Sequence, residues 1–142
     1  MGDDLAAANV NRSYSLAATS IAIFTFVLIF LYPRFASGEV NAVLFQATLI
    51  VLGVATFAFV FATFHYYGSS LTNVVDDADR ARYARRGDRL WLLGSALLYL
   101  DPSLVLLTVG LLGVGLVWLA LWLIYLVFLI RYFPRVQPWP KS

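Results

Sequence analysis

The sequence predicts an all-α membrane protein, a bundle of four transmembrane helices whose third helix is kinked or broken. Hydrophobic residues make up 61% of the chain and charged residues only 13%, whereas a soluble domain has about 25% charged residues. Apolar stretches long enough to cross a hydrocarbon core of ~30 Å recur along the chain. The Lys and Arg residues also fall very unequally on the two sides of a four-crossing topology, as in multi-pass membrane proteins.

The first apolar stretch covers about residues 14–32, close to the ~20 residues that a spanning helix needs. Pro33 and Arg34 follow it and are expected to end it. The stretch is longer than the apolar core of a signal peptide, and Asp3 and Asp4 stand where a signal peptide has basic residues. We therefore expect a helix that the protein retains.

The second stretch covers about residues 40–67 and is long enough to cross the membrane with a tilt. The apolar stretch from Leu90 to Tyr132 is too long for one crossing. The glycines between positions 110 and 115 tolerate a turn, so the stretch divides into helices at about 89–110 and 114–133. The whole chain, residues 1–142, then forms a single membrane domain.

Four crossings place both termini and a central basic loop, at about residues 68–88, on the same side of the membrane. That side holds nine of the ten Lys and Arg residues, and Arg34 alone lies on the other. The positive-inside rule therefore predicts a multi-pass protein of the cell membrane with both termini and the loop in the cytoplasm. A three-crossing alternative, with one helix from Pro102 to Tyr132, divides the same charges six against four and is disfavoured.

Helices in lipid associate through close packing at small residues, and three of the predicted helices carry a face of small or polar residues. These faces should point toward protein. Their members are Ser15, Ala18, Ala22 and Thr25 in the first helix, Ala55, Ala58, Ala62 and His65 in the second, and Gly94, Asp101 and Thr108 in the third. The fourth helix has an aromatic face of Trp118, Trp122 and Tyr125, which is typical of packing against another helix, with a pocket for a lipid or planar cofactor as the alternative.

Asp101 is the main candidate for a functional residue, because an acidic group near the bilayer centre costs ~2.5–3.5 kcal/mol and commonly has a role. It directly precedes Pro102, and Asp before Pro is also typical of a helix start. Three interpretations stay open: a cap at a kink or break of the helix, an intramembrane proton or cation site, and a differently placed span that leaves Asp101 near water.

The single histidine, His65, follows Phe64 near the end of the second helix, where it is expected to be an interfacial residue. The arginines that precede the third helix suit a solvated, topology-determining loop. The more specific alternative is that these arginines contact anionic lipid headgroups or an acidic partner. These arginines are Arg82, Arg85, Arg86 and Arg89.

The chain has no cysteine, no paired histidines and no glycine-rich phosphate loop, so the sequence predicts no enzyme, no metal site and no cofactor. The expected partners are the lipid bilayer and other membrane subunits, with no nucleic acid. Two functions remain: a non-enzymatic scaffold, anchor or regulatory subunit that forms a homo-oligomer or part of a larger complex, and a homo-oligomeric channel or carrier that uses Asp101.

Overall fold

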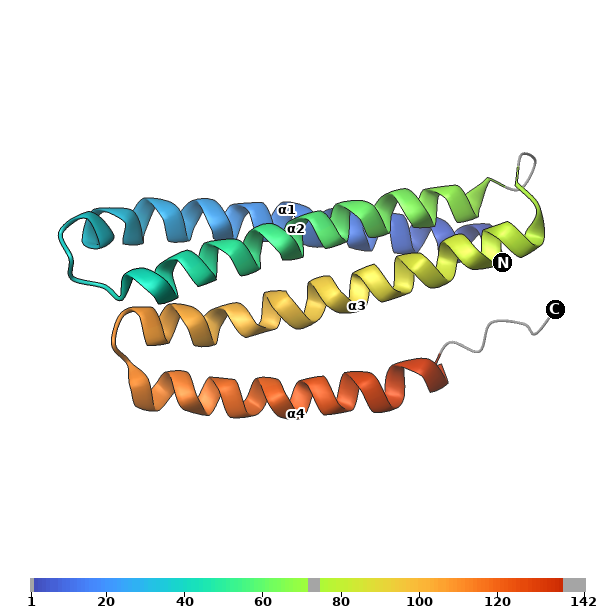
Figure 1. Cartoon of the computed structure of the whole chain (residues 1–142). Helices are drawn as coiled ribbons and strands as arrows, with labels where there is room; N and C mark the ends of the chain where they lie inside the picture. Colours follow the sequence, from blue (N-terminus) through green and yellow to red (C-terminus); the bar gives the residue numbers. More distant parts are fainter. Residues whose placement is uncertain (1, 72–74, 137–142) are drawn as a thin grey trace.

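Four long helices that lie side by side make up the protein (Figure 1). The computed structural model describes residues 2–71 and 75–136, and the side chains of residues 5–71 and 75–131. The helices are α1 (Gly2–Ala36), α2 (Ala42–Ser70), α3 (Asp77–Thr108) and α4 (Leu112–Val136). Each contains a segment long and apolar enough to cross a membrane. The predicted fold class, an all-α bundle of four such helices, is confirmed.

The helices alternate in direction, so two ends of the bundle can be distinguished (Figure 1). The start of α1, the end of α2, the start of α3 and the end of α4 lie together at one end. We call this the basic end, because it includes the arginines between residues 80 and 89. The tight connections from α1 to α2 and from α3 to α4 lie at the opposite end, which we call the turn end. Lys141, counted with the basic side above, lies outside the described residues.

The two connections at the turn end are short because local residues support them. Gly38 and Gly110 have positive φ angles, 76° and 82°, which only glycine adopts readily. Asn41 caps α2 by accepting hydrogen bonds from the backbone amides of Val43 at 3.1 Å and Leu44 at 3.0 Å. The chain therefore reverses twice at this end through glycines in the left-handed conformation, and Asn41 caps the start of α2.

Several helix boundaries differ from those expected. The first helix begins at Gly2 rather than at about residue 14. The third begins at Asp77 rather than at about residue 89, so most of the predicted loop at about residues 68–88 is helical. The first helix continues through Pro33 to Ala36, because a proline so near the C-terminus removes only one of the last hydrogen bonds. The third helix likewise passes through Pro102 without ending and restarting. The fourth begins at Leu112, because only Gly110 supplies the positive φ of the turn.

The helices do not form a symmetric square. Both α1 and α3 pack against α2, whereas α4, among the described residues, packs against α3 alone. Among the residues of α4 from Leu112 to Arg131, only Gly115 is buried. The core therefore lies among the first three helices, and α4 is attached to its side.

The α2–α3 contact is a seam with a seven-residue repeat, which equals two helical turns and keeps its members on one side of each helix. On α2 the repeat consists of large residues and on α3 of small or polar residues, all of them buried. The pairs in register are Tyr66 with Gly87, Phe59 with Gly94, Leu52 with Asp101, and Phe45 with Thr108. An added Cβ at Gly87 or Gly94 would lie 2.9 Å from the facing ring, so glycine is what lets these rings approach the backbone of α3.

Candidate functional site

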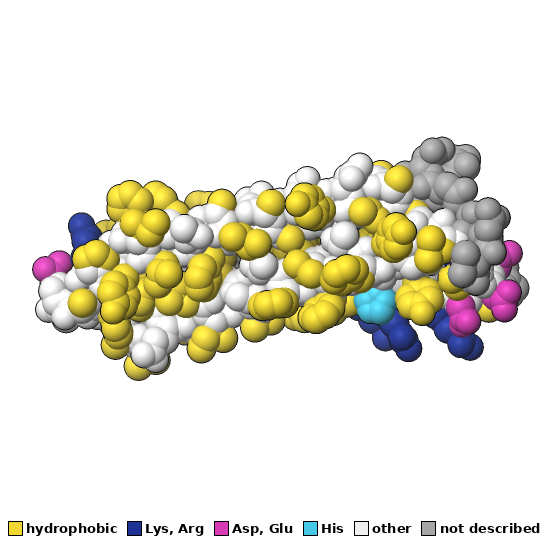
Figure 2. All heavy atoms as spheres, turned by 90° about the horizontal axis from the view of Figure 1, so that it is seen from above, with side chains coloured by type: hydrophobic (Ala, Val, Ile, Leu, Met, Phe, Trp, Pro, Cys, Tyr) yellow, Lys and Arg dark blue, Asp and Glu magenta, His cyan; other side chains and the backbone are white. Residues whose placement is uncertain are grey.

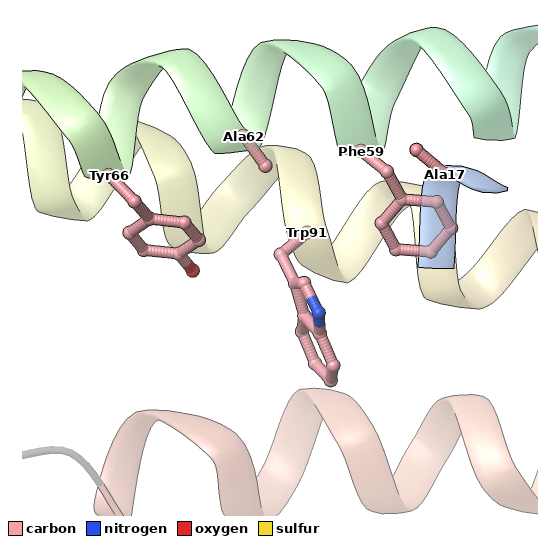
Figure 3. Packing of buried hydrophobic residues seen from close by; sticks show 5 residues of the cluster. All are labelled: Ala17, Phe59, Ala62, Tyr66 and Trp91. Carbon is pink, nitrogen blue, oxygen red and sulfur yellow. The ribbon is translucent and has the colours of Figure 1, made fainter. Parts of the chain in front are cut away.

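A polar cluster ties α1, α2 and α3 together at the basic end. The hydroxyl of Tyr66 donates a 2.7 Å hydrogen bond to Oδ1 of Asp88, and both side chains are buried. The guanidinium of Arg12 lies 4.0 Å from the centre of the Trp91 ring, a cation–π contact. In Figure 3, Trp91 lies between Tyr66 and Phe59 along the bundle. These contacts join one side chain from α1, one from α2 and two from α3.

This cluster was not predicted from the sequence, in which Arg12 is one of several basic residues and Asp88 ends the predicted central loop at about residues 68–88. The available signal was the position of Asp88 directly after Gly87, in the row that continues through Gly94 to Asp101. Gly87 lies seven residues before Gly94 and therefore on the same buried face of the helix. The next residue, Asp88, then lies at the edge of the contact with α2.

Asp101 lies inside the bundle, as expected for the polar face of the third helix. Its side chain is 3% exposed and its Oδ1 atom has no hydrogen-bond partner. The hydroxyls of Ser103 and Ser20 are likewise buried and without partners among the described residues. The register of the seam places Asp101 level with Leu52, an apolar side chain that is fully buried.

This arrangement does not match a helix-break cap. Asp101 lies within a continuous helix, one residue before Pro102, and its buried oxygen accepts no backbone amide. It does not form a metal site with neighbours either, because no group of three or more His, Cys, Asp or Glu side chains lies together in the described part of the chain. The residue is a buried acid whose Oδ1 has no hydrogen-bond partner among the described residues.

His65 and Asp101 lie far apart, as the sequence indicated. His65 is one residue from Tyr66, which bonds Asp88, and Asp101 is thirteen residues further along α3, roughly 20 Å at ~1.5 Å per residue. The imidazole ring instead lies against the ring of Tyr83, with centroids 5.9 Å apart. His65 therefore belongs to the basic end.

The arginines of the basic end differ in their contacts. Arg80 and Arg82 form ion pairs within α3, with Asp77 at 3.3 Å and Asp79 at 3.1 Å. Arg85 donates from Nε to the carbonyl of Ala81 in its own helix, at 3.2 Å. Arg86 and Arg89 have exposed side chains and no carboxylate partner among the described residues. These last two cations are available to an external anion.

The small-residue faces gave one correct and one wrong prediction. Ala55, Ala58 and Ala62 of α2 are all buried, so that face is confirmed. The face of α1 formed by Ser15, Ala18, Ala22 and Thr25 is exposed and was assigned wrongly. The buried row of α1 instead consists of Ala6, Ser13, Ala17, Ser20 and Val27. Both rows have small residues at helical spacing, and only the position of α2 decides between them.

The aromatic face of α4 packs on α3, as its more typical interpretation indicated. Trp122 donates from Nε1 to the carbonyl of Ala96 at 2.7 Å, and the Tyr125 ring lies 4.8 Å from that of Tyr99. Trp118 remains 44% exposed. These contacts attach α4 to α3 and leave its other faces open.

Two features can carry function: the buried acid at Asp101 and the unpaired cations at the basic end. The first lies in an apolar interior and the second on an accessible surface. Both rest on the geometry of this chain alone. Comparison with known proteins found no family model, no curated sequence and no solved structure that matches it.

Proposed function

We propose that the chain is a non-enzymatic subunit of the cell membrane that scaffolds, anchors or regulates a membrane assembly. In this proposal the basic end and both termini lie in the cytoplasm. One observation carries it: α4 packs against α3 alone and exposes large apolar side chains around most of its surface. Such a helix offers a broad face for packing against a second copy or another membrane subunit.

Apolar exposure by itself is the normal state of a helix in lipid, so the attachment of α4 is the stronger support. Its fixed contacts with α3 include the Trp122–Ala96 hydrogen bond, while Ile124 and Val127 point away from the bundle with more than half of their surface exposed. A helix held at one edge of a three-helix core is positioned to bridge the core and a neighbour.

Cross-linking tests the proposal cleanly because the chain contains no cysteine. Ile124→Cys, on the exposed face of α4, should form disulfide-linked species in native membranes. The matched control is Ile29→Cys on α1, where the side chain is exposed to a similar extent, 62% against 67%. A ladder of homo-oligomers or one defined larger product from position 124 alone supports the proposal. Equal cross-linking from both positions, or none from position 124, contradicts it.

A homo-oligomeric channel or carrier is the second candidate, and the buried Oδ1 of Asp101 is the observation that favours it. Against it, the described grooves are lined by other residues, and Asp101 belongs to no group of three or more His, Cys, Asp or Glu side chains among the described residues. The test is proton or cation flux into liposomes that contain the purified protein. Flux that Asp101→Asn abolishes would replace the subunit proposal with this one.

A further inference from the structure

An open groove with apolar walls runs along the outer surface of α2 and reaches α3. Its volume is about 420 Å³. Ile50, Gly53, Phe57 and Phe61 line it on α2, and Leu90 and Leu93 line it on α3. A Cβ atom added at Gly53 would meet nothing within 4 Å, so the glycine leaves open space in the floor of the groove.

The length of the groove suits a lipid tail. From Ile50 to Phe61 it extends roughly 16 Å along α2, at ~1.5 Å per residue. One leaflet of a bilayer has a hydrocarbon depth of roughly 15 Å, half of the ~30 Å core. An acyl chain lying parallel to α2 therefore fits the groove from end to end.

Basic side chains lie at the end of the groove marked by Phe61 and Leu90. His65 follows Phe61 by four residues on α2, and Arg86 precedes Leu90 by four residues on α3, so each lies one turn beyond the groove on the same face of its helix. Arg86 is close enough to His65 to interact with it electrostatically. Figure 2 shows the single histidine beside Lys and Arg side chains, at the edge of the apolar surface.

Some of the arginines at this end of the groove have no carboxylate partner among the described residues. Arg80 and Arg82 have carboxylate partners, whereas Arg86 and Arg89 have none in the part of the chain that the structure describes. Two exposed guanidinium groups and an imidazole next to an acyl-length groove are complementary to a phosphate joined to a hydrocarbon tail.

We propose that this surface of α2 and α3 binds one anionic phospholipid, with an acyl chain in the groove and the phosphate held by Arg86, Arg89 and His65. The proposal adds a ligand to the proposed membrane subunit and rests on its insertion in a bilayer, but not on its assembly through α4. Arg85 is assigned no contact with the phosphate, because its Nε donates to the carbonyl of Ala81 in its own helix.

The test uses the full chain, purified in a non-ionic detergent and titrated with phosphatidylglycerol or phosphatidylcholine of the same acyl chains. Native mass spectrometry measures lipid bound per chain. We expect the wild-type chain to bind phosphatidylglycerol more tightly. A basic residue near the membrane surface contributes ~1 kcal/mol, and 1.4 kcal/mol is tenfold in affinity. Arg86→Gln and Arg89→Gln should therefore each weaken phosphatidylglycerol binding about fivefold, and phosphatidylcholine binding by less, because the choline ammonium already offsets the charge of its phosphate.

Two matched controls isolate the site. Arg85→Gln removes the same charge from the neighbouring position and should leave the affinity close to wild type. Gly53→Leu fills the groove and should weaken both lipids, whereas Gly113→Leu adds the same side chain on α4, where there is also open space, and should change neither. The melting temperature of each variant verifies that it is folded.

Three results would overturn the proposal: equal affinity for the two lipids, equal losses for Arg85→Gln and Arg86→Gln, or unchanged binding in Gly53→Leu. A shift in oligomeric state with Gly53→Leu, without loss of lipid, would assign the groove to a second copy of the chain and overturn it as well. Cross-linking at position 124 is measured separately, so failure of the lipid site and failure of the α4 interface are distinguishable.

Discussion

Asp101 has an unfavourable environment, because its carboxyl group is buried with Oδ1 unpartnered and level with Leu52. Burying an ionised carboxylate without a partner costs far more than burying a neutral polar group. The Tyr66–Asp88 pair, in contrast, satisfies one oxygen of its carboxyl group with a short hydrogen bond. The two acids of α3 in the bundle therefore have opposite effects on stability, and single substitutions separate them.

Asp101→Asn should keep the fold and raise its stability, by on the order of 1 kcal/mol, because the amide carries no charge to desolvate. The measurement is the melting temperature in detergent, together with flux in liposomes. Unchanged function with equal or higher stability agrees with a subunit role. Loss of flux with an intact fold would show that Asp101 conducts an ion, contrary to the proposed function.

Tyr66→Phe should lower the free energy of unfolding by about 1.5–3 kcal/mol, as expected for a hydrogen bond to a charged group. The ring still packs against Gly87, so the change removes only the hydroxyl. Tyr67→Phe, at a neighbouring side chain that is 59% exposed, is the matched control and should be neutral. Equal melting temperatures for the two variants would mean that the bond to Asp88 contributes nothing.

At the scale of helices, close approach depends on which small residues face a partner. In α3, Gly87 and Gly94 accept aromatic rings of α2, whereas Gly53 of α2 lies over an open groove. In α1 the small residues on one side are buried and those on the other are exposed. A larger side chain should therefore destabilise the bundle at the buried positions and should not do so at the exposed ones. This difference gives two paired tests of the packing.

Gly94→Ala should destabilise the α2–α3 seam by about 1–3 kcal/mol, the usual cost of overpacking, because the new Cβ would lie 2.9 Å from the Phe59 ring. Gly53→Ala meets no neighbour and should stabilise α2 by up to about 1 kcal/mol through helix propensity. Thermal unfolding of both variants in the same detergent measures the difference. Identical shifts in the two would contradict the seam.

Ala62→Leu should destabilise the core by a similar amount, about 1–3 kcal/mol, since Ala62 is fully buried in the cluster that contains Ala17 and Phe59. Ala18→Leu, on the exposed face of α1, should stay within about 0.5 kcal/mol of the wild-type chain. Unfolding by denaturant in detergent compares the two. Greater damage from Ala18→Leu would mean that the exposed face of α1 is an interface.

At the scale of the whole molecule, the three-helix core and the attached α4 have different roles. The core has two extended seams, and α4 has one partner. Charged side chains on the face in Figure 2 gather at the two ends, with apolar side chains between them. This distribution is what a bilayer requires of a spanning bundle, and it makes the orientation testable.

Single cysteines at Ser37 and Ala78, both exposed and at opposite ends, report the orientation in intact cells. A membrane-impermeant thiol reagent should label Ser37→Cys, and should label Ala78→Cys only after the membrane is opened, because the proposed topology keeps the arginine-rich side in the cytoplasm. Labelling of position 78 in sealed cells, with position 37 protected, would invert the proposed topology.

The helices, their number and the turn at Gly110 could be predicted from the sequence, because apolar length and glycine chemistry are local properties. The burial of Gly94, Asp101 and Thr108 could also be predicted, since lipid excludes such a row. The sequence left open whether Pro102 kinks or breaks the third helix, because Asp followed by Pro is also typical of a helix start. The structure has one continuous helix there.

The sequence by itself determined which segments form helices long and apolar enough to cross a membrane, and which charged side chains lie at their ends. Only the tertiary structure decided which face of α1 is buried, that Asp88 bonds Tyr66, and that the groove of α2 meets Arg86 and His65. The physical reason is that hydropathy acts on each helix alone. The choice between two similar faces depends on the shape of the partner helix, and residues far apart in the chain supply that shape.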